Sequence, residues 1–149
     1  MTDNNLYAKI VADQYYALNE YQEDAVKSAV YPGRGACIGA LYVALKLAGE
    51  AGEVAENVGK AIRDDGFLVT EDLNVPRDAA FDNDPWAYSK WFVPERREKI
   101  IRELGDVLWY VAAMADELGI TLADVAAVNI AKLRDRQERG VIQGSGDDR

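Results

Sequence analysis

The chain has 149 residues, of which 49% are apolar, so we expect one globular domain at 1–140, followed by a flexible tail at 141–149. Its formal net charge of −9 argues against a nucleic-acid partner, and the absence of histidine removes the usual ligand of catalytic zinc. One cysteine, no signal peptide and no apolar run of about eighteen residues favour a cytoplasmic protein without a membrane partner.

Apolar residues that recur at three- and four-residue spacing predict four main helices, separated by glycine and proline. Thr121 and Asp124 form a capping-box pattern at the start of the last helix. We find no convincing strand, so the predicted fold is all-α, a four-to-five-helix bundle. The predicted helices span Asn5–Ala29, Ile38–Arg63, Pro94–Leu118 and the residues from Thr121 to about Gly140.

A long irregular insertion, residues 67–94, separates the second and third predicted helices. It contains three of the four prolines and shows no sustained helical period. A segment of this length without regular structure is usually functional or mobile in a compact domain. The sequence does not assign it a role.

The second predicted helix carries a polar stripe about 80° wide. Glu50, Glu53, Asn57 and Lys60 form this stripe, and Lys46 continues it one turn earlier. We expect Lys46 and Asn57 only to border a site. Apolar residues predict the core-facing surfaces of the second and third helices: Leu41, Leu45, Ala48, Ala55 and Ile62 on the second, and Ile100, Leu104, Val107, Leu108, Val111, Ala115 and Leu118 on the third.

Two acidic pairs suggest metal chemistry. Glu50 and Glu53 lie three residues apart on the second helix, and Glu103 and Asp106 have the same spacing on the third. If these helices pack antiparallel, four carboxylates meet, and like charges so close require cations. Oxygen ligands without histidine or thiolate favour Mg²⁺ or Mn²⁺, whose remaining ligands are often substrate phosphates.

Basic and amide side chains supply candidate phosphate contacts. Lys60 shares the acidic stripe of the second helix. Asn129, Lys132 and Arg136 recur along one face of the fourth helix. These groups are suited to hold phosphate oxygens that metal ions leave uncovered.

The segments GEAGEVAENVGKAIR, ELGDVLWY and NIAKLRDR together resemble the MazG-like family of all-α nucleoside triphosphate pyrophosphohydrolases. The resemblance covers most of residues 15–65 and 95–139, although the linker between the acidic motifs is much longer than in compact members. It implies Mg²⁺ ligands, phosphate contacts and positions close to the nucleotide. The ligands would be Glu50, Glu53, Glu103 and Asp106, the phosphate contacts Lys60, Asn129, Lys132 and Arg136, and the positions near the nucleotide Tyr110 and Gln22.

The implied reaction is Mg²⁺-dependent hydrolysis of a (deoxy)nucleoside triphosphate to the monophosphate and pyrophosphate, for sanitation or control of nucleotide pools. Glu50 or Glu53 would orient or deprotonate the attacking water. A homodimer or a dimer of dimers is expected from packing and from the family. Two alternatives are a phosphoribosyl-ATP pyrophosphohydrolase-like enzyme and a non-catalytic helical dimerisation or regulatory module.

Overall fold

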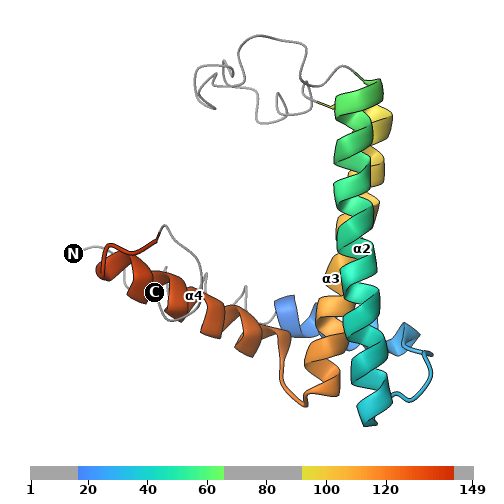
Figure 1. The fold of residues 1–149 in the computed structure, drawn as a ribbon. Helices are drawn as coiled ribbons and strands as arrows, with labels where there is room; N and C mark the ends of the chain where they lie inside the picture. Colours follow the sequence, from blue (N-terminus) through green and yellow to red (C-terminus); the bar gives the residue numbers. More distant parts are fainter. Residues whose placement is uncertain (1–16, 66–91, 143–149) are drawn as a thin grey trace. The chain divides into compact units, whose positions relative to one another are not determined.

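The computed structural model describes residues 17–65 and 92–142, and within these ranges it contains helices and no strands (Figure 1). Residues 17–25 are helical, and the later elements are η1 (Val26–Ser28), α2 (Cys37–Asp64), α3 (Pro94–Glu117) and α4 (Leu122–Glu138). The predicted all-α fold is confirmed, and the bounds of α2, α3 and α4 agree with the predictions to within two residues. The described ranges leave out residues 1–16, 66–91 and 143–149. The omitted residues include the start of the first predicted helix, most of the insertion and most of the tail.

The chain divides into two compact units, which we describe separately. The terminal unit comprises residues 1–43 and 111–149, and the central unit comprises residues 44–110. The first contains the start of α2, the end of α3 and all of α4. The second contains the remainder of α2 and α3.

In the terminal unit, the predicted break before α2 is a glycine-dependent loop. Gly33 and Gly35 have φ angles of 74° and 76°, which are unfavourable for residues with a side chain. The Glu117 carboxylate accepts hydrogen bonds from the Tyr31 hydroxyl at 2.7 Å and from the Gly35 N–H at 3.1 Å. A Cβ on Gly39 would lie 2.4 Å from the Gly33 carbonyl oxygen. The loop therefore packs tightly against the start of α2.

The predicted start of α4 is also confirmed. Thr121 caps the helix, and its side chain accepts a hydrogen bond from the backbone N–H of Asp124. The Asp124 side chain in turn accepts from the Thr121 N–H, which completes the capping box. Gly119 precedes the cap with φ 67°, and Gly140 follows the helix with φ 69°. These local signals were readable from sequence because capping depends on residues close together in the chain.

Small apolar side chains form most of the buried core that the structure describes in the terminal unit. Small side chains allow helices to approach closely, so this unit is packed largely through alanine. The buried apolar residues are Ala29, Val43, Ala112, Ala113, Ala115, Leu122 and Ala123.

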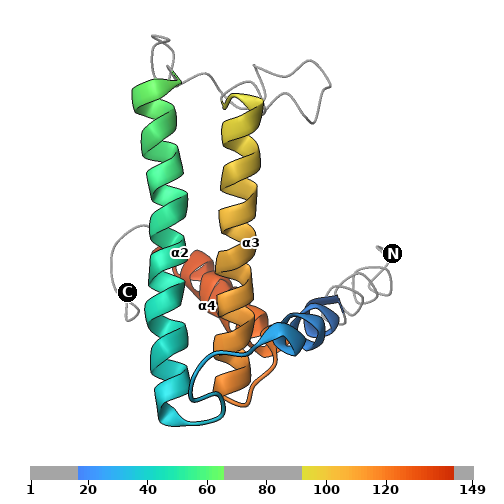
Figure 2. The same ribbon diagram turned by 90° about the vertical axis from the view of Figure 1, so that its right-hand side faces the viewer.

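In the central unit, α2 and α3 run side by side and antiparallel (Figures 1 and 2). Near one end of the pair Lys46 lies over the Tyr110 ring, and near the other Arg96 bonds to Asp65. Residue numbers thus rise along α2 as they fall along the adjoining α3. This confirms the packing on which convergence of the acidic pairs depended.

The prediction of which side of α2 faces the core is wrong within a single chain. Leu45 is 76% exposed and Ile62 44% exposed, while Glu50 and Asn57 on the polar stripe are buried. The sequence period located both stripes, but α3 packs against the polar one. The residues of the predicted face that the chain leaves exposed are Leu41, Leu45, Ala48, Ala55 and Ile62.

The prediction for α3 is wrong in part for the same reason. Ala115 is buried as predicted, but Leu104 and Leu108 are 51% and 42% exposed, and Leu118 is 62% exposed. In the central unit, the glycines of α2 do not serve close packing on α3, because a Cβ at Gly49, Gly52 or Gly59 would meet nothing within 4 Å. In the described ranges, none of the helices combines the length and apolar content needed to cross a membrane.

Candidate functional site

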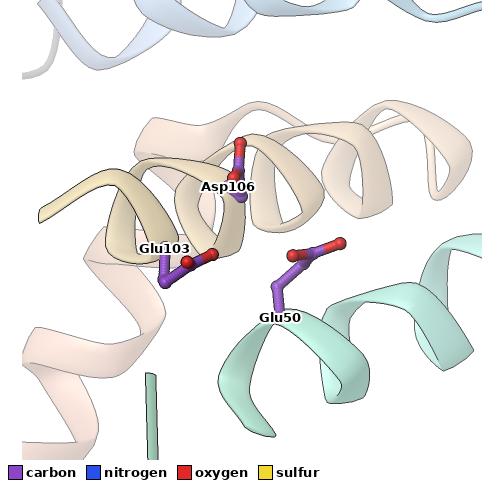
Figure 3. Close-up of side chains that lie close together, drawn as sticks. All are labelled: Glu50, Glu103 and Asp106. Atoms are coloured by element: carbon purple, nitrogen blue, oxygen red, sulfur yellow. The ribbon is translucent and has the colours of Figure 1, made fainter. Parts of the chain in front are cut away.

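Three carboxylates converge between α2 and α3 in the central unit. Glu50 comes from α2, and Glu103 and Asp106 come from adjacent turns of α3 (Figure 3). One oxygen of each lies within 4.8 Å of the others. Glu50 is buried, Glu103 is half-buried and Asp106 is exposed. We call these residues the acid cluster.

The acid cluster contains three of the four predicted metal ligands. Glu53, one turn after Glu50 on α2, is exposed and is not among the carboxylates that the structure brings together. Its role therefore stays a prediction. The antiparallel packing explains the convergence, since it brings the middle of α2 against the middle of α3.

The donor set of the acid cluster fits a hard divalent cation. Its members offer carboxylate oxygens, the ligands that Mg²⁺ and Mn²⁺ prefer. Three carboxylates this close repel one another unless a cation or protons reduce their charge. An exposed side, at Asp106, would give substrate oxygens access to the ion.

Lys46 contacts the acid cluster, which the sequence reasoning missed. Its Nζ lies 2.9 Å from Glu50 Oε1 and 5.8 Å from the centroid of the Tyr110 ring. Tyr110 in turn makes an edge-to-face contact with Trp109, with ring centroids 4.7 Å apart. We expected Lys46 only to border a site. The available signal was its position four residues before Glu50 on the same stripe.

Asn57 is the second residue that the sequence reasoning undervalued. It is 7% exposed, and its Nδ2 donates to the Glu53 backbone carbonyl at 3.1 Å and approaches Glu103 Oε1 at 3.5 Å. Arg96 Nη1 donates to Asn57 Oδ1 at 3.4 Å. A guanidinium can only donate, so this contact orients the amide with its NH₂ group toward Glu103. Asn57 therefore supports a member of the acid cluster.

An ion pair anchors the other side of Arg96. Its Nε donates to Asp65 Oδ2 at 2.8 Å and its Nη2 to Asp65 Oδ1 at 3.3 Å. These hydrogen bonds hold the pKa of Asp65 below its ordinary value. The side chain of Asp65 is only 16% exposed and that of Arg96 only 12% exposed. The sequence did not suggest this pair because Asp65 and Arg96 flank the insertion.

Lys60 lies on α2 as predicted and pairs with Glu56 at 2.6 Å. The hydrogen bond from Lys60 lowers the pKa of Glu56. This is the ion-pair alternative for Lys60, and it is compatible with exchange of Glu56 for a phosphate because both side chains are partly exposed. The phosphate-binding role of Lys60 stays a prediction.

The other predicted substrate residues belong to the terminal unit. On α4, Asn129 and Lys132 are exposed, whereas Arg136 is only 6% exposed. They lie on one helix at the predicted spacing. Their contacts with a nucleotide stay predictions.

Gln22 has a structural role in the terminal unit. It is 9% exposed, its Nε2 donates to the Ile120 carbonyl at 3.1 Å, and its Oε1 accepts from the Leu122 N–H at 2.7 Å. The pocket that it lines, of about 300 Å³, also contains Glu23 and Asp116 and has no basic lining residue. That lining is unfavourable for a polyphosphate, and the predicted contact of Gln22 with a nucleotide remains untested.

Comparisons with known proteins agree with the chemistry of the acid cluster. The family model of the MazG nucleotide pyrophosphohydrolase domain matches residues 40–141, a range that includes the cluster. The Gene 37 protein of Mycobacterium phage L5 is 40% identical over 132 residues, which cover 87% of this chain and 96% of that protein. No solved structure matches.

Proposed function

Because this chain belongs to the MazG nucleotide pyrophosphohydrolase family, we propose that it hydrolyses a (deoxy)nucleoside triphosphate to the monophosphate and pyrophosphate, with Mg²⁺ as its cofactor. The observation that carries this proposal is the convergence of Glu50, Glu103 and Asp106 from two antiparallel helices. One oxygen from each of these carboxylates lies within 4.8 Å of the others, an arrangement that is unfavourable without a cation and therefore favours a metal site over a helical module without catalytic function. The physiological role that we propose is sanitation or control of nucleotide pools.

The acid cluster would hold the divalent ions. Bound there, Mg²⁺ or Mn²⁺ would supply charge neutralisation for the triphosphate and a more acidic water at neutral pH. Glu50 and Glu103 are at least partly shielded from solvent, which strengthens their attraction for a cation. Asn57, which donates toward Glu103, would keep that carboxylate turned into the site.

We assign Glu53 as the residue that orients or deprotonates the attacking water. Glu50 lies in the acid cluster and is paired with Lys46, whereas Glu53 is exposed and lies outside the cluster. A carboxylate that does not bind the ions is free to accept a proton from water. Attack at the α-phosphorus would then release pyrophosphate.

Basic side chains would bind the phosphates and stabilise the negative charge of the leaving pyrophosphate. Lys60 of the central unit is a candidate, since its ammonium already pairs with an exposed carboxylate. Lys132 and Arg136, with Asn129 beside them on α4, are the candidates of the terminal unit. Tyr110, close to Lys46, is a candidate contact for the nucleotide.

We further propose that the chain works as a homodimer or a dimer of dimers. In the central unit, Leu45, Ala48, Gly52, Ala55, Gly59 and Ile62 recur at alternating three- and four-residue spacing on the exposed side of α2. Ile101, Leu104 and Leu108 continue this pattern on α3, and each is more than 40% exposed. Such spacing is typical of a seam between packed helices. A second copy would cover this apolar seam.

The test is an assay of pyrophosphate release from each dNTP and NTP, and from phosphoribosyl-ATP, with Mg²⁺. We expect Glu103→Gln and Asp106→Asn to lower kcat/KM by at least about a hundredfold, since loss of groups that only support metal ligands already costs about 10–100-fold. Glu98→Gln is the matched control, because Glu98 lies on the same helix and pairs with Arg102 outside the acid cluster.

Three results would contradict parts of this proposal. Full activity in both acid variants would remove the acid cluster from catalysis. Turnover of phosphoribosyl-ATP alone would keep the fold and change the substrate. Absence of turnover with every nucleotide, for a folded protein at saturating metal, would favour the helical module.

A further inference from the structure

A basic side chain already contacts the acid cluster. Lys46 Nζ lies 2.9 Å from Oε1 of Glu50, whose side chain is only 11% exposed. The Lys46 side chain itself is 42% exposed, so its ammonium has access to solvent. Lys46 therefore neutralises part of the charge of the acid cluster while its own side chain stays in contact with solvent.

Helix stability alone does not account for this pair. In an i, i+4 pair, a glutamate that precedes the lysine is the more favourable order, because it agrees with the helix dipole. Lys46 and Glu50 have the reverse order, whereas Glu56 and Lys60 on the same helix have the favourable one. The position of Lys46 is better explained by the charge of the acid cluster than by support of α2.

A divalent cation and the Lys46 ammonium compete for the same carboxylate. A cation that binds Glu50 uses the carboxylate lone pairs that accept the hydrogen bond from Lys46 in its absence. The cation also repels the Lys46 ammonium, which lies only a few ångströms away. Lysine has a long, flexible side chain, so its ammonium is able to move without a change in the backbone. Oxygens of a polyphosphate bound to the same cation would offer it a new partner.

Resting on the proposed function, we propose that Lys46 is a displaceable counter-ion of the metal site. It neutralises Glu50 until a divalent cation binds, and it then moves to the polyphosphate of the substrate. Lys46 thereby weakens binding of metal alone and strengthens binding of the metal–nucleotide complex. The result is preferential assembly of the site when both metal and nucleotide are present.

The test measures metal affinity without nucleotide, by titration with Mn²⁺ followed by EPR and with Mg²⁺ followed by calorimetry. We expect Lys46→Gln to bind either ion about three- to tenfold more tightly, because it removes both the competing ion pair and a nearby positive charge. Lys46→Arg keeps the charge and is expected to retain the wild-type affinity.

Arg63→Gln is the matched control for charge. It removes a basic side chain from an exposed ion pair of α2, about 26 Å further along the helix axis. We expect its metal affinity to stay within about twofold of the wild type, since salt screens charges at that distance. Circular dichroism of each variant establishes that it is folded.

The second measurement is the KM for a dNTP at saturating Mg²⁺. We expect Lys46→Gln to raise KM about three- to tenfold, opposite in direction to its effect on metal affinity. Unchanged or weaker metal binding by Lys46→Gln, or an unchanged KM, would overturn the counter-ion role while leaving the metal site in place. Absence of Mn²⁺ and Mg²⁺ binding by both the wild type and Lys46→Gln, together with no release of pyrophosphate from any dNTP at saturating Mg²⁺, would instead overturn the proposed function.

Discussion

The two units of the chain bury different kinds of side chains. In the terminal unit the described core consists mostly of small apolar residues, and buried Gln22 bonds to backbone groups of the turn before α4. In the central unit, Glu50 and Asn57 are buried between the helices, while Leu45 and Ile101 are exposed. Among the described residues, the terminal unit buries seven apolar side chains and the central unit buries one, Ala61, while both units leave larger apolar side chains exposed.

The residues buried in the central unit are therefore better explained by function than by stabilisation of the fold. A helix pair that buries carboxylates gains little from the burial, because charged groups lose their hydration. On the proposed function, the central unit holds divalent ions between its helices and presents an apolar seam to a second copy, instead of forming a self-sufficient core.

The largest expected effect concerns the exposed seam. Leu45→Gln combined with Ile101→Gln should weaken self-association by at least about a hundredfold, because each buried aliphatic side chain contributes about 1.5–3 kcal/mol and a two-fold interface contains each change twice. Sedimentation equilibrium measures the dissociation constant. Val30→Gln is the control, since Val30 is a 92% exposed apolar residue outside the helices. A wild-type chain that is monomeric at all concentrations would contradict the proposed dimer.

The two buried amides should respond differently to the same change. Asn57→Leu should weaken Mn²⁺ binding about 10–100-fold, as expected for loss of a group that supports a metal ligand. Gln22→Leu should leave Mn²⁺ affinity unchanged and lower the free energy of unfolding by about 1–3 kcal/mol, because backbone groups at Ile120 and Leu122 lose their partner. EPR titration and urea unfolding measure the two quantities.

Each of these variants serves as the control for the other. Equal Mn²⁺ affinity in both would show that Asn57 is a packing residue. A rise in the KM for a dNTP on Gln22→Leu, without a matching loss of stability, would instead place Gln22 at the nucleotide, as the family resemblance implies.

Two glycines of α2 should show effects of opposite sign. Gly39→Ala should destabilise the chain by about 1–3 kcal/mol, because the new Cβ would lie 2.4 Å from the Gly33 carbonyl oxygen. Gly59→Ala meets nothing within 4 Å and should stabilise α2 by up to about 1 kcal/mol. Urea unfolding in the Leu45→Gln, Ile101→Gln background measures both without dimerisation. Destabilisation by Gly59→Ala in that background would show that the face is not open.

The smallest effect is a pH dependence in the terminal unit. Burial, and then the hydrogen bond to Glu117, raises the pKa of Tyr31 from 10.0 to about 12. Because the folded-state pKa is the higher one, the stabilisation is complete below pH 10 and is lost as the pH rises through 12. Tyr31 is partly exposed, so we expect a loss of only about 1 kcal/mol. Thermal unfolding at pH 9 and pH 11 should show this loss in the wild type, and Tyr31→Phe should lack it.

Much of the local structure was predictable from sequence. The capping box at Thr121 and the end of α3 near Leu118 were identified correctly, because helix ends depend on residues within one turn of each other. The spacing of Glu50, Glu103 and Asp106 also pointed to the acid cluster that the structure brings together. The predicted core face of α2 was wrong, because a period defines stripes without showing which stripe meets a neighbour.

The sequence by itself therefore determined the all-α class, the bounds of α2, α3 and α4, and the pairing of acids at helical spacing, since all of these follow from short-range periodicity. Only the tertiary structure decided that α3 covers the polar stripe of α2, that Glu50 and Asn57 are buried as a result, and that Arg96 orients Asn57. Such contacts join segments that are far apart in the chain, or select among several partners within reach of one side chain. Their outcome depends on which helix faces meet, which local spacing does not encode.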